Sequence, residues 1–376
     1  MLEPRCDLER EKGIAMLQTR VNSGLDGVVV ADTVMSEVDG EEGRLVVRGH
    51  ALDELVATRG FEGVAALLWD GYAEGGGDAA SVQKGMAAGR VRAFELVPRL
   101  LPATRGLNPV EALRVGIGML SDSEKTPHHF LLCGAMPMFL SALLNAEKNL
   151  SPIAPDPALT TAQDLLRMIR GQRAGEVFER GLDTYLATVA DHGFNASTFT
   201  GRVVASTHAG LIASVLGAPC ALKGTLHGGA PGPVLDMLDE IGEPARAEAW
   251  FDDAFAKGAP LMGCGHRIYK VRDPRADVLK SAVSTFPQTA GRLAYASEVE
   301  KGAIAALRKH KPGRRLDINV EYYTALLLEA LEIPRSAFTA LFAVGRTAGW
   351  CGHVFEQVKG GRLIRPQSNY VGPRSS

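Results

Sequence analysis

The stretch GCGHRIYKVRDPR at Gly263–Arg275 is the part of the sequence that most clearly indicates a functional site. Glycines on both sides of Cys264 let the backbone approach a ligand without a Cβ atom in between, and His266 follows directly. Four cations lie within nine residues of this histidine: Arg267, Lys270, Arg272 and Arg275. A basic run alone is more typical of a solvated helix start. The glycine-flanked histidine favours a site for a substrate with several negative charges, beside an imidazole that can share a proton near neutral pH.

The composition sets broad limits on the class of protein. The chain has 376 residues, 46% of them hydrophobic and 22% charged, which is typical of a soluble globular protein with one large or two moderate domains. A formal net charge of −2 argues against a nucleic-acid partner. The five cysteines include no C-x-x-C pair, so neither a disulfide framework nor a metal site is expected. The first twenty residues carry four acidic side chains, unlike a signal or transit peptide, so we expect a cytoplasmic protein.

One strand signal and one strongly apolar segment stand out. Val28–Val30 and Leu45–Val47 flank the turn-forming residues Asp39–Gly43, which predicts a small β-hairpin. The uncharged run Phe130–Leu144 is shorter than the ~20 residues that span a bilayer, and Pro137 interrupts it. We therefore expect a buried core helix and no membrane partner.

The remainder of the chain has helical signals and no alternation of strands with helices. Asn108 is a predicted N-cap, followed by a proline at the first helical position. Asn195 is another predicted N-cap. In Ala196–Ser214, 12 of 19 residues are Gly, Ala, Ser or Thr. A helix this smooth predicts another backbone packed close against it, from a neighbouring helix, a second subunit, or both.

Three further positions could carry chemistry. His227 lies in a second glycine-flanked stretch, LHGGA, where a turn and a site are equally supported. His192 precedes the N-cap Asn195 and is either a loop residue or a ligand. Glu321 enters a leucine-rich helix, where apolar surroundings would raise its pKa and suit a general base. The alternative is a first-turn glutamate favoured by the helix dipole.

Six motifs, in this order, resemble the citrate synthase family over nearly all of Gly24 to Gly372. They are DHGFNASTF at 191–199, LHGGA at 226–230, GxGHRxYK with DPR at 263–275, NVE at 319–321, GRTAGW at 345–350, and RP with YxG at 365–372. The resemblance implies a mostly α, two-domain fold with one small N-terminal β-hairpin. The large domain would be 1–228 plus 332–376, and a mobile small domain would be 229–331.

The resemblance also implies a reaction. The family joins the methyl carbon of acetyl-CoA to the ketone of oxaloacetate and hydrolyses the thioester, with no metal or redox cofactor. The implied catalytic residues are His227, His266 and Glu321. The implied oxaloacetate-binding residues are His192, Arg275, Arg346 and Arg365, and positions implied to line the CoA pocket are Gly263, Gly265, Lys270 and Asn319. In the family the arginine matching Arg365 reaches the partner subunit's site, which implies a homodimer.

The chain departs from the family at Glu321, because the family's base is usually aspartate. Glutamate is one methylene longer, and errors of about 1 Å in positioning can cost roughly 10²-fold in rate. The rate and the acyl-CoA preference therefore stay open. One alternative is 2-methylcitrate synthase acting on propionyl-CoA, since discrimination of one methylene is only about 10–200-fold. Another is a catalytically weak relative that binds CoA or a dicarboxylate as a sensor or an assembly partner.

Overall fold

The computed structural model describes residues 24–25, 27–228, 231–259, 261–266, 268–313 and 316–373. The contacts divide the chain into two units, Met1–Thr33 and Val34–Ser376. The described part of the first unit has no helix or strand, and Val28–Val30 is exposed irregular chain. The prediction of a strand there was wrong, because the segment that pairs with Leu45–Val47 across the short turn is Ser36–Asp39, not Val28–Val30. All that follows concerns the second unit.

A small antiparallel sheet holds the predicted turn. Its strands are β1 (Ser36–Asp39), β2 (Arg44–Val47) and β3 (His50–Ala51), in the order β1-β2-β3. Ser36 pairs with Val47 and Asp39 with Arg44, so the β1–β2 turn is the one that the sequence predicted. Leu45 and Val47 are each only 2% exposed, and they anchor the sheet on the core.

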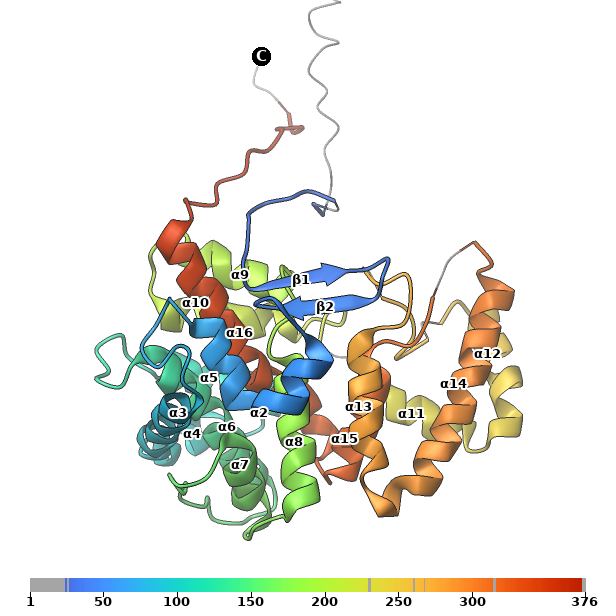
Figure 1. The fold of residues 1–376 in the computed structure, drawn as a ribbon, viewed down its shortest axis with the longest axis horizontal. Helices are drawn as coiled ribbons and strands as arrows, with labels where there is room; N and C mark the ends of the chain where they lie inside the picture. Colours follow the sequence, from blue (N-terminus) through green and yellow to red (C-terminus); the bar gives the residue numbers. More distant parts are fainter. Residues whose placement is uncertain are drawn as a thin grey trace, which may run out of the picture. The chain divides into compact units, whose positions relative to one another are not determined.

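The rest of the described second unit is dominated by helices (Figure 1). The first group comprises α2 (Leu52–Trp69), α3 (Ala79–Phe94), α4 (Val97–Ala103), α5 (Pro109–Gly118), α6 (His128–Glu147), α7 (Thr161–Arg170), α8 (Glu176–Val189), α9 (Ala196–Ala205) and α10 (Leu211–Leu222). The later helices are α11 (Pro231–Ile241), α12 (Ala247–Ala256), α13 (Pro274–Ser284), α14 (Ala290–His310), α15 (Val320–Ala330) and α16 (Phe338–Gly360). Short 3₁₀ turns are η1 (Pro244–Arg246), η2 (Pro287–Thr289) and η3 (Arg335–Ala337).

Helix α6 is the central helix of the core. It packs against α3, α5, α7 and α16. Its 20 residues are long and apolar enough to cross a membrane, yet 94% of its most apolar window is buried inside the protein. The expected buried core helix is confirmed. The expectation that Pro137 interrupts it was wrong, because the helix continues through the proline.

Local capping signals were reliable. Asn108 Oδ1 accepts the backbone N–H of Glu111 at 3.0 Å, and Asn195 Oδ1 accepts that of Ser197 at 3.1 Å. Both predicted N-caps are confirmed.

The segment 196–214, which is rich in small residues and was predicted as one helix, forms two helices. Helices α9 and α10 are separated by a break in which His208 (φ +61°) and Gly210 (φ +90°) have left-handed backbone. The two helices pack closely, since a Cβ atom on Gly201 would lie 3.3 Å from the Ser214 carbonyl oxygen. The small side chains therefore serve helix–helix approach, as predicted. A role against a second subunit stays a prediction.

The C-terminal helices place the candidate site. Helix α13 packs against α15 and α8, and α16 also packs against α8. Helix α8 is therefore the common neighbour of α13 and α16, which carry candidate site residues. Figure 1 shows α13 and α15 between α8 and α14. The expected domain boundaries at 228/229 and 331/332 stay a prediction.

Candidate active site

Five segments that are far apart in the sequence converge on one electrostatically connected cluster. The rings of His192 and His266 are 5.4 Å apart in an edge-on arrangement. The charges of Arg275, Arg346 and His227 also act on His192. Glu321 feels the charges of Arg275 and Arg346. Six sequence-predicted site residues are therefore brought together: His192, His227, His266, Arg275, Glu321 and Arg346.

His266 is held as a neutral imidazole by its own loop. Its Nδ1 accepts the backbone N–H groups of Ile268 and Tyr269, each at 3.1 Å. Burial and the nearby Arg275 lower its pKa to about 4. A ring that is neutral and accepts hydrogen bonds at Nδ1 carries its proton on Nε2. His266 therefore presents an Nε2–H donor.

His227 is held in the opposite tautomer. Its Nε2 accepts the backbone N–H of Ser197 at 3.3 Å and lies 2.8 Å from Ser197 Oγ. Burial and Arg346 lower its pKa to about 4, so the neutral ring carries its proton on Nδ1. Asn195 holds Ser197 in place through two hydrogen bonds. Its Oδ1 caps α9 by accepting the Ser197 backbone N–H, and it also accepts the Ser197 hydroxyl at 2.8 Å. The capping motif and the histidine are thus one structural unit.

His192 lies deepest of the three histidines. It is 5% exposed, and its Nε2 is 3.2 Å from the Tyr269 hydroxyl. Burial, with Arg275 and Arg346, holds its pKa well below the usual range. It is therefore a neutral group that can hydrogen-bond an anion between two cations.

Glu321 is a buried carboxyl group at the start of α15. Its backbone N–H donates to Asn319 Oδ1 at 2.9 Å, and the residue is 8% exposed. Burial raises its pKa to about 7; Asp273 adds to this, while Arg275 and Arg346 oppose it. The predicted raised pKa is confirmed. The residue also lies in the first turn of α15, so its position fits both the general-base interpretation and the first-turn glutamate interpretation.

The two buried arginines are held in different ways. Arg275, 3% exposed, forms a fork with Asp273 through Nε–Oδ1 at 3.0 Å and Nη2–Oδ2 at 2.7 Å. Arg346, 1% exposed, donates from Nε to the Val189 carbonyl at 2.5 Å and stacks on Phe342. Its Nη2 has no hydrogen-bond partner within the described chain. Arg346 can therefore still bind an anion.

The positions implied for CoA mostly brace the His266 loop. Gly263 and Gly265 have φ of +74° and +79°. Asn319 donates its backbone N–H to the Gly263 carbonyl at 3.0 Å and its Nδ2 to the Gly265 carbonyl at 2.7 Å. Lys270 is exposed and forms an ion pair with Glu41. Contact of these residues with CoA stays a prediction.

Two residues of the predicted site are not part of this cluster. Arg365 is exposed on the segment after α16, where its Nη1 donates to the Pro366 carbonyl at 3.1 Å. Its role in a partner's site stays a prediction. Arg267 lies outside the described residues.

The sequence interpretation missed four residues that shape the site: Ser197, Asp273, Tyr185 and Tyr269. Three of them stand inside the motifs that were recognised, so neighbouring motif letters were the available signal. Asp273 N-caps α13, forks with Arg275 and also accepts the Val320 N–H at 3.2 Å. Tyr185, on α8, carries no such sequence signal.

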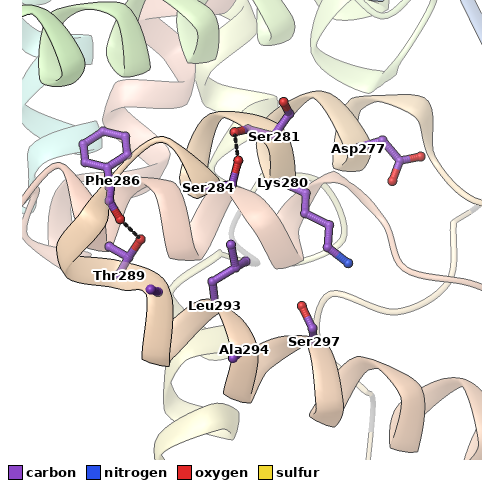
Figure 2. A pocket seen from close by; sticks show the side chains of 10 residues that line it. Asp277, Lys280, Ser281, Ser284, Phe286, Thr289, Leu293, Ala294 and Ser297 are labelled. Atoms are coloured by element: carbon purple, nitrogen blue, oxygen red, sulfur yellow. Dashed lines mark hydrogen bonds between the residues drawn. The ribbon is translucent and has the colours of Figure 1, made fainter.

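Pockets near the cluster are lined by other residues. One of about 860 Å³ lies among β2, α2, α8 and α13 and includes Pro274, the neighbour of Arg275. Another of about 530 Å³ lies between α13 and α14 (Figure 2), where Lys280 is tied to Glu300 at 3.1 Å. Within the described ranges, no group of three potential metal ligands is found.

Comparisons with known proteins give a consistent picture. A family model described as "Citrate synthase, C-terminal domain" matches residues 24–367. "Putative citrate synthase 2" of Mycobacterium tuberculosis H37Rv is 36% identical over 356 residues, 93% of this chain and 92% of that protein. The "Citrate/2-methylcitrate synthase" of Bacillus subtilis is 31% identical over 368 residues, 93% of this chain and 96% of its own.

Solved structures agree with these sequence matches. The crystal structure of citrate synthase from Thermotoga maritima superposes with a TM-score of 0.84 at 32% identity, covering 95% of this chain and 97% of that one. A ternary complex of citrate synthase from Thermoplasma acidophilum with carboxymethyl coenzyme A and oxaloacetate gives a TM-score of 0.83 at 26% identity, covering 94% and 96% of the two chains.

Proposed function

This chain belongs to the citrate synthase family, and we propose that it condenses acetyl-CoA with oxaloacetate through Glu321, His227 and His266 and releases citrate and CoA. The observation that carries the proposal is a buried carboxyl group with a pKa of about 7 beside two buried arginines. Near neutral pH such a carboxyl group is partly ionised, which is the condition for a general base. The paired neutral imidazoles supply the donors that the reaction needs.

Oxaloacetate is the substrate that the cations fit. Arg275 and Arg346 bring two buried guanidinium groups to the cluster, Arg346 with its Nη2 unpaired, and His192 adds a neutral imidazole near both. We assign Arg365 of a second subunit to the same dicarboxylate site. Its exposure on the segment after α16 supports this assignment, which makes the active protein a homodimer.

The condensation can be written with every proton placed. Glu321 removes a proton from the acetyl methyl group while His227 Nδ1–H hydrogen-bonds the thioester oxygen, which develops the charge of the enol. The methylene carbon then bonds the ketone carbon of oxaloacetate. His266 Nε2–H protonates the ketone oxygen, and Arg275 nearby stabilises the negative charge left on the ring. Water then returns a proton to His266, and the hydroxide attacks the citryl thioester carbonyl. Glu321 gives the proton it took to the leaving CoA sulfur, which releases citrate and CoA and restores both residues.

No metal or redox cofactor is part of this proposal, and the CoA thioester is a substrate. Gly263, Gly265, Lys270 and Asn319 are assigned to the CoA side because they build the loop around His266. We place the enzyme in the cytoplasm, with no nucleic-acid or membrane partner.

One alternative substrate has specific support. The B. subtilis relative carries the name citrate/2-methylcitrate synthase, and both reactions use the same catalytic groups. The test is CoA thiol release from purified protein given oxaloacetate with acetyl-CoA or propionyl-CoA. Higher kcat/KM with acetyl-CoA supports citrate synthesis, and higher kcat/KM with propionyl-CoA moves the assignment to 2-methylcitrate. Tight oxaloacetate binding without thiol release would indicate a binding protein instead.

A further inference from the structure

His353 on α16 is a buried histidine that the proposed reaction does not use. It is 0% exposed, and both of its ring nitrogens have side-chain partners. Arg202 Nη1, on α9, lies 3.2 Å from Nδ1, and Asp191 Oδ1, two residues after the end of α8, lies 3.1 Å from Nε2. Since arginine has no acceptor atom, Nδ1 accepts and the ring proton is on Nε2. His353 therefore donates a hydrogen bond to Asp191.

The side chain that sets this tautomer is itself held firmly. Arg202 Nη1 also forms an ion pair with Glu356, and its Nε donates to Gln357 Oε1 at 3.0 Å. Because arginine stays protonated in proteins, the ring nitrogen that faces it stays an acceptor. The donor that His353 offers to Asp191 is therefore set by α9 and α16 together.

Asp191 transmits this restraint to the backbone around His192. Its Oδ2 accepts the Gly193 backbone N–H at 3.2 Å and also the Ser36 hydroxyl. Ser36 Oγ, on β1, in turn accepts the Gly193 N–H at 2.9 Å. An aspartate bonded to the N–H two residues further on closes a turn over the residue between them, which here is His192. The turn that presents His192 is therefore held by residues of both β1 and α16.

Asp191 is an ionised carboxylate in a buried position. It is 2% exposed. Burial raises the pKa of this carboxyl group, but His353 and the Ser36 hydroxyl outweigh burial and lower the pKa to about 2. A buried charge that loses one of its donors is costly, so the side chain shifts to find another partner. Loss of the His353 donor should therefore loosen the turn that depends on Asp191.

We propose that His353 is a positioning residue for oxaloacetate binding: through Asp191 it fixes the turn that directs the His192 ring into the site. This inference rests on the proposed function, in which His192 binds oxaloacetate. The His192 ring lies 5.4 Å from that of His266, and its Nε2 lies 3.2 Å from the Tyr269 hydroxyl. A change in the backbone at His192 therefore displaces a polar group in the middle of the cluster.

The experiment measures oxaloacetate binding by calorimetry for wild type, His353→Leu and His353→Gln. We expect His353→Leu, which has no donor, to bind oxaloacetate about tenfold more weakly, the equivalent of one well-placed hydrogen bond. Its kcat at saturating oxaloacetate and its KM for acetyl-CoA should stay within about threefold of wild type, because Glu321 and His227 are untouched. His353→Gln keeps an amide donor that can reach Asp191, so it should recover most of the affinity.

The matched control is His129→Leu. His129 is also buried, its Nε2 lies 3.0 Å from the Glu74 carbonyl, and its ring packs against Trp69 and Phe130 on another side of the core. It should lose stability to denaturant and keep the wild-type affinity for oxaloacetate. The control separates a general loss of stability from a loss of position at His192.

A double-mutant cycle tests whether the effect passes through His192. His192→Ala should weaken oxaloacetate binding by itself, and adding His353→Leu should then weaken it by less than about twofold more. Equal losses in the two backgrounds overturn the inference, since His353 would then act on binding without His192.

Ser36→Ala covers the case in which His353→Leu fails to fold. Ser36 is only partly buried, and its hydroxyl bonds both Asp191 and Gly193. We expect about two- to fivefold weaker oxaloacetate binding, again absent in the His192→Ala background. Wild-type affinity in folded His353→Leu, or in Ser36→Ala when it alone folds, overturns the inference and leaves the proposed function intact. Wild-type protein that binds no oxaloacetate would instead overturn the proposed function.

Discussion

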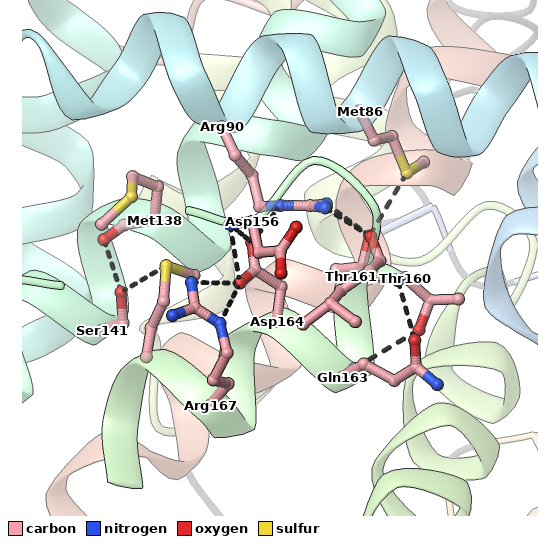
Figure 3. Close-up of polar contacts among 12 residues, drawn as sticks. Met86, Arg90, Met138, Ser141, Asp156, Thr160, Thr161, Gln163, Asp164 and Arg167 are labelled. Atoms are coloured by element: carbon pink, nitrogen blue, oxygen red, sulfur yellow. Dashed lines mark hydrogen bonds and ion pairs between the residues drawn. The ribbon is translucent and has the colours of Figure 1, made fainter. Parts of the chain in front are cut away.

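Two buried arginines in this molecule are satisfied to very different degrees. Arg90 on α3 is 0% exposed and donates to Asp164 Oδ2 at 2.8 Å and to Thr161 Oγ1 at 3.4 Å (Figure 3). It also donates to the Leu159 carbonyl at 2.7 Å. Asp164 is in turn bonded by Arg167. Arg346 is just as buried, but it forms no ion pair within 4.0 Å among the described residues: its Nε bonds one carbonyl, its guanidinium lies over Phe342, and its Nη2 has no hydrogen-bond partner.

The difference separates scaffold from site. At Arg90 the chain itself supplies the compensation that a buried charge needs, and the ion pair ties α3 to α7. At Arg346, Glu321 and Tyr185 the chain leaves buried donors and an acceptor unpaired. Unpaired polar atoms reduce stability, so their presence in one electrostatically connected cluster indicates that substrate and reaction use them.

The largest expected effect is on the scaffold pair. Asp164→Asn leaves Arg90 as an uncompensated buried charge, so the free energy of unfolding should fall by about 3–5 kcal/mol. Denaturant unfolding measures this. A loss below about 1 kcal/mol would mean that Arg90 does not depend on the pair.

Arg346→Met should give the opposite pattern. Removing a poorly compensated buried cation should change the free energy of unfolding by less than about 1 kcal/mol. The KM for oxaloacetate should rise about 10²-fold or more, because a buried charge contact with a substrate carboxylate is worth about 2–5 kcal/mol. If this variant unfolds as readily as Asp164→Asn, Arg346 belongs to the scaffold and the comparison fails.

Glu321 also predicts a pH dependence of stability. Its folded-state pKa of about 7 lies above the unfolded value of about 4.3, so the folded state binds the extra proton between these values. The stability that this proton contributes is present below about pH 4.3 and is lost as pH rises to about 7. Glu321→Gln should therefore be more stable than wild type at pH 8, by up to about 3 kcal/mol.

The pH dependence must be compared between wild type and Glu321→Gln, because His227 and His266 change the stability of both proteins with the opposite dependence on pH. Their pKa values are lowered to about 4, so their contribution is lost as pH falls through about 6.5 to 4. Both histidines are present in wild type and variant, and their effect cancels in the difference. An equal difference in unfolding free energy at pH 5 and pH 8 would show that the Glu321 pKa is not raised.

The smallest expected effect is at the surface. Lys270 and Glu41 form an exposed ion pair, and such pairs contribute about 0–1 kcal/mol. Lys270→Met should barely change stability or the KM for oxaloacetate, and it should raise the KM for acetyl-CoA a few-fold. An unchanged acetyl-CoA KM would remove Lys270 from the CoA side.

The parts of the fold that local chemistry determines were predictable from the sequence. The caps at Asn108 and Asn195 need only the residues beside them, and the buried α6 needs only its apolar composition. The first strand was misplaced at Val28–Val30, because the residues that pair with Arg44–Val47 across the turn are Ser36–Asp39, and three of these four are polar. The break at His208 was missed because a left-handed non-glycine residue has little sequence signal.

The candidate site was predictable to a similar extent. The histidines, Glu321 and the two buried arginines stand in motifs, so their convergence could be expected. Tyr185 lies outside these motifs, and only the structure shows that its hydroxyl is buried without a hydrogen-bond partner among the described residues.

The most direct measurement compares wild type with Glu321→Gln, monitoring CoA thiol release with oxaloacetate and acetyl-CoA and, separately, oxaloacetate binding by calorimetry. Loss of the base should lower kcat by about 10²–10⁴-fold, while oxaloacetate binds within a few-fold of wild type because its arginines are untouched. Turnover within tenfold of wild type in Glu321→Gln would contradict the assignment of this carboxyl group as the base.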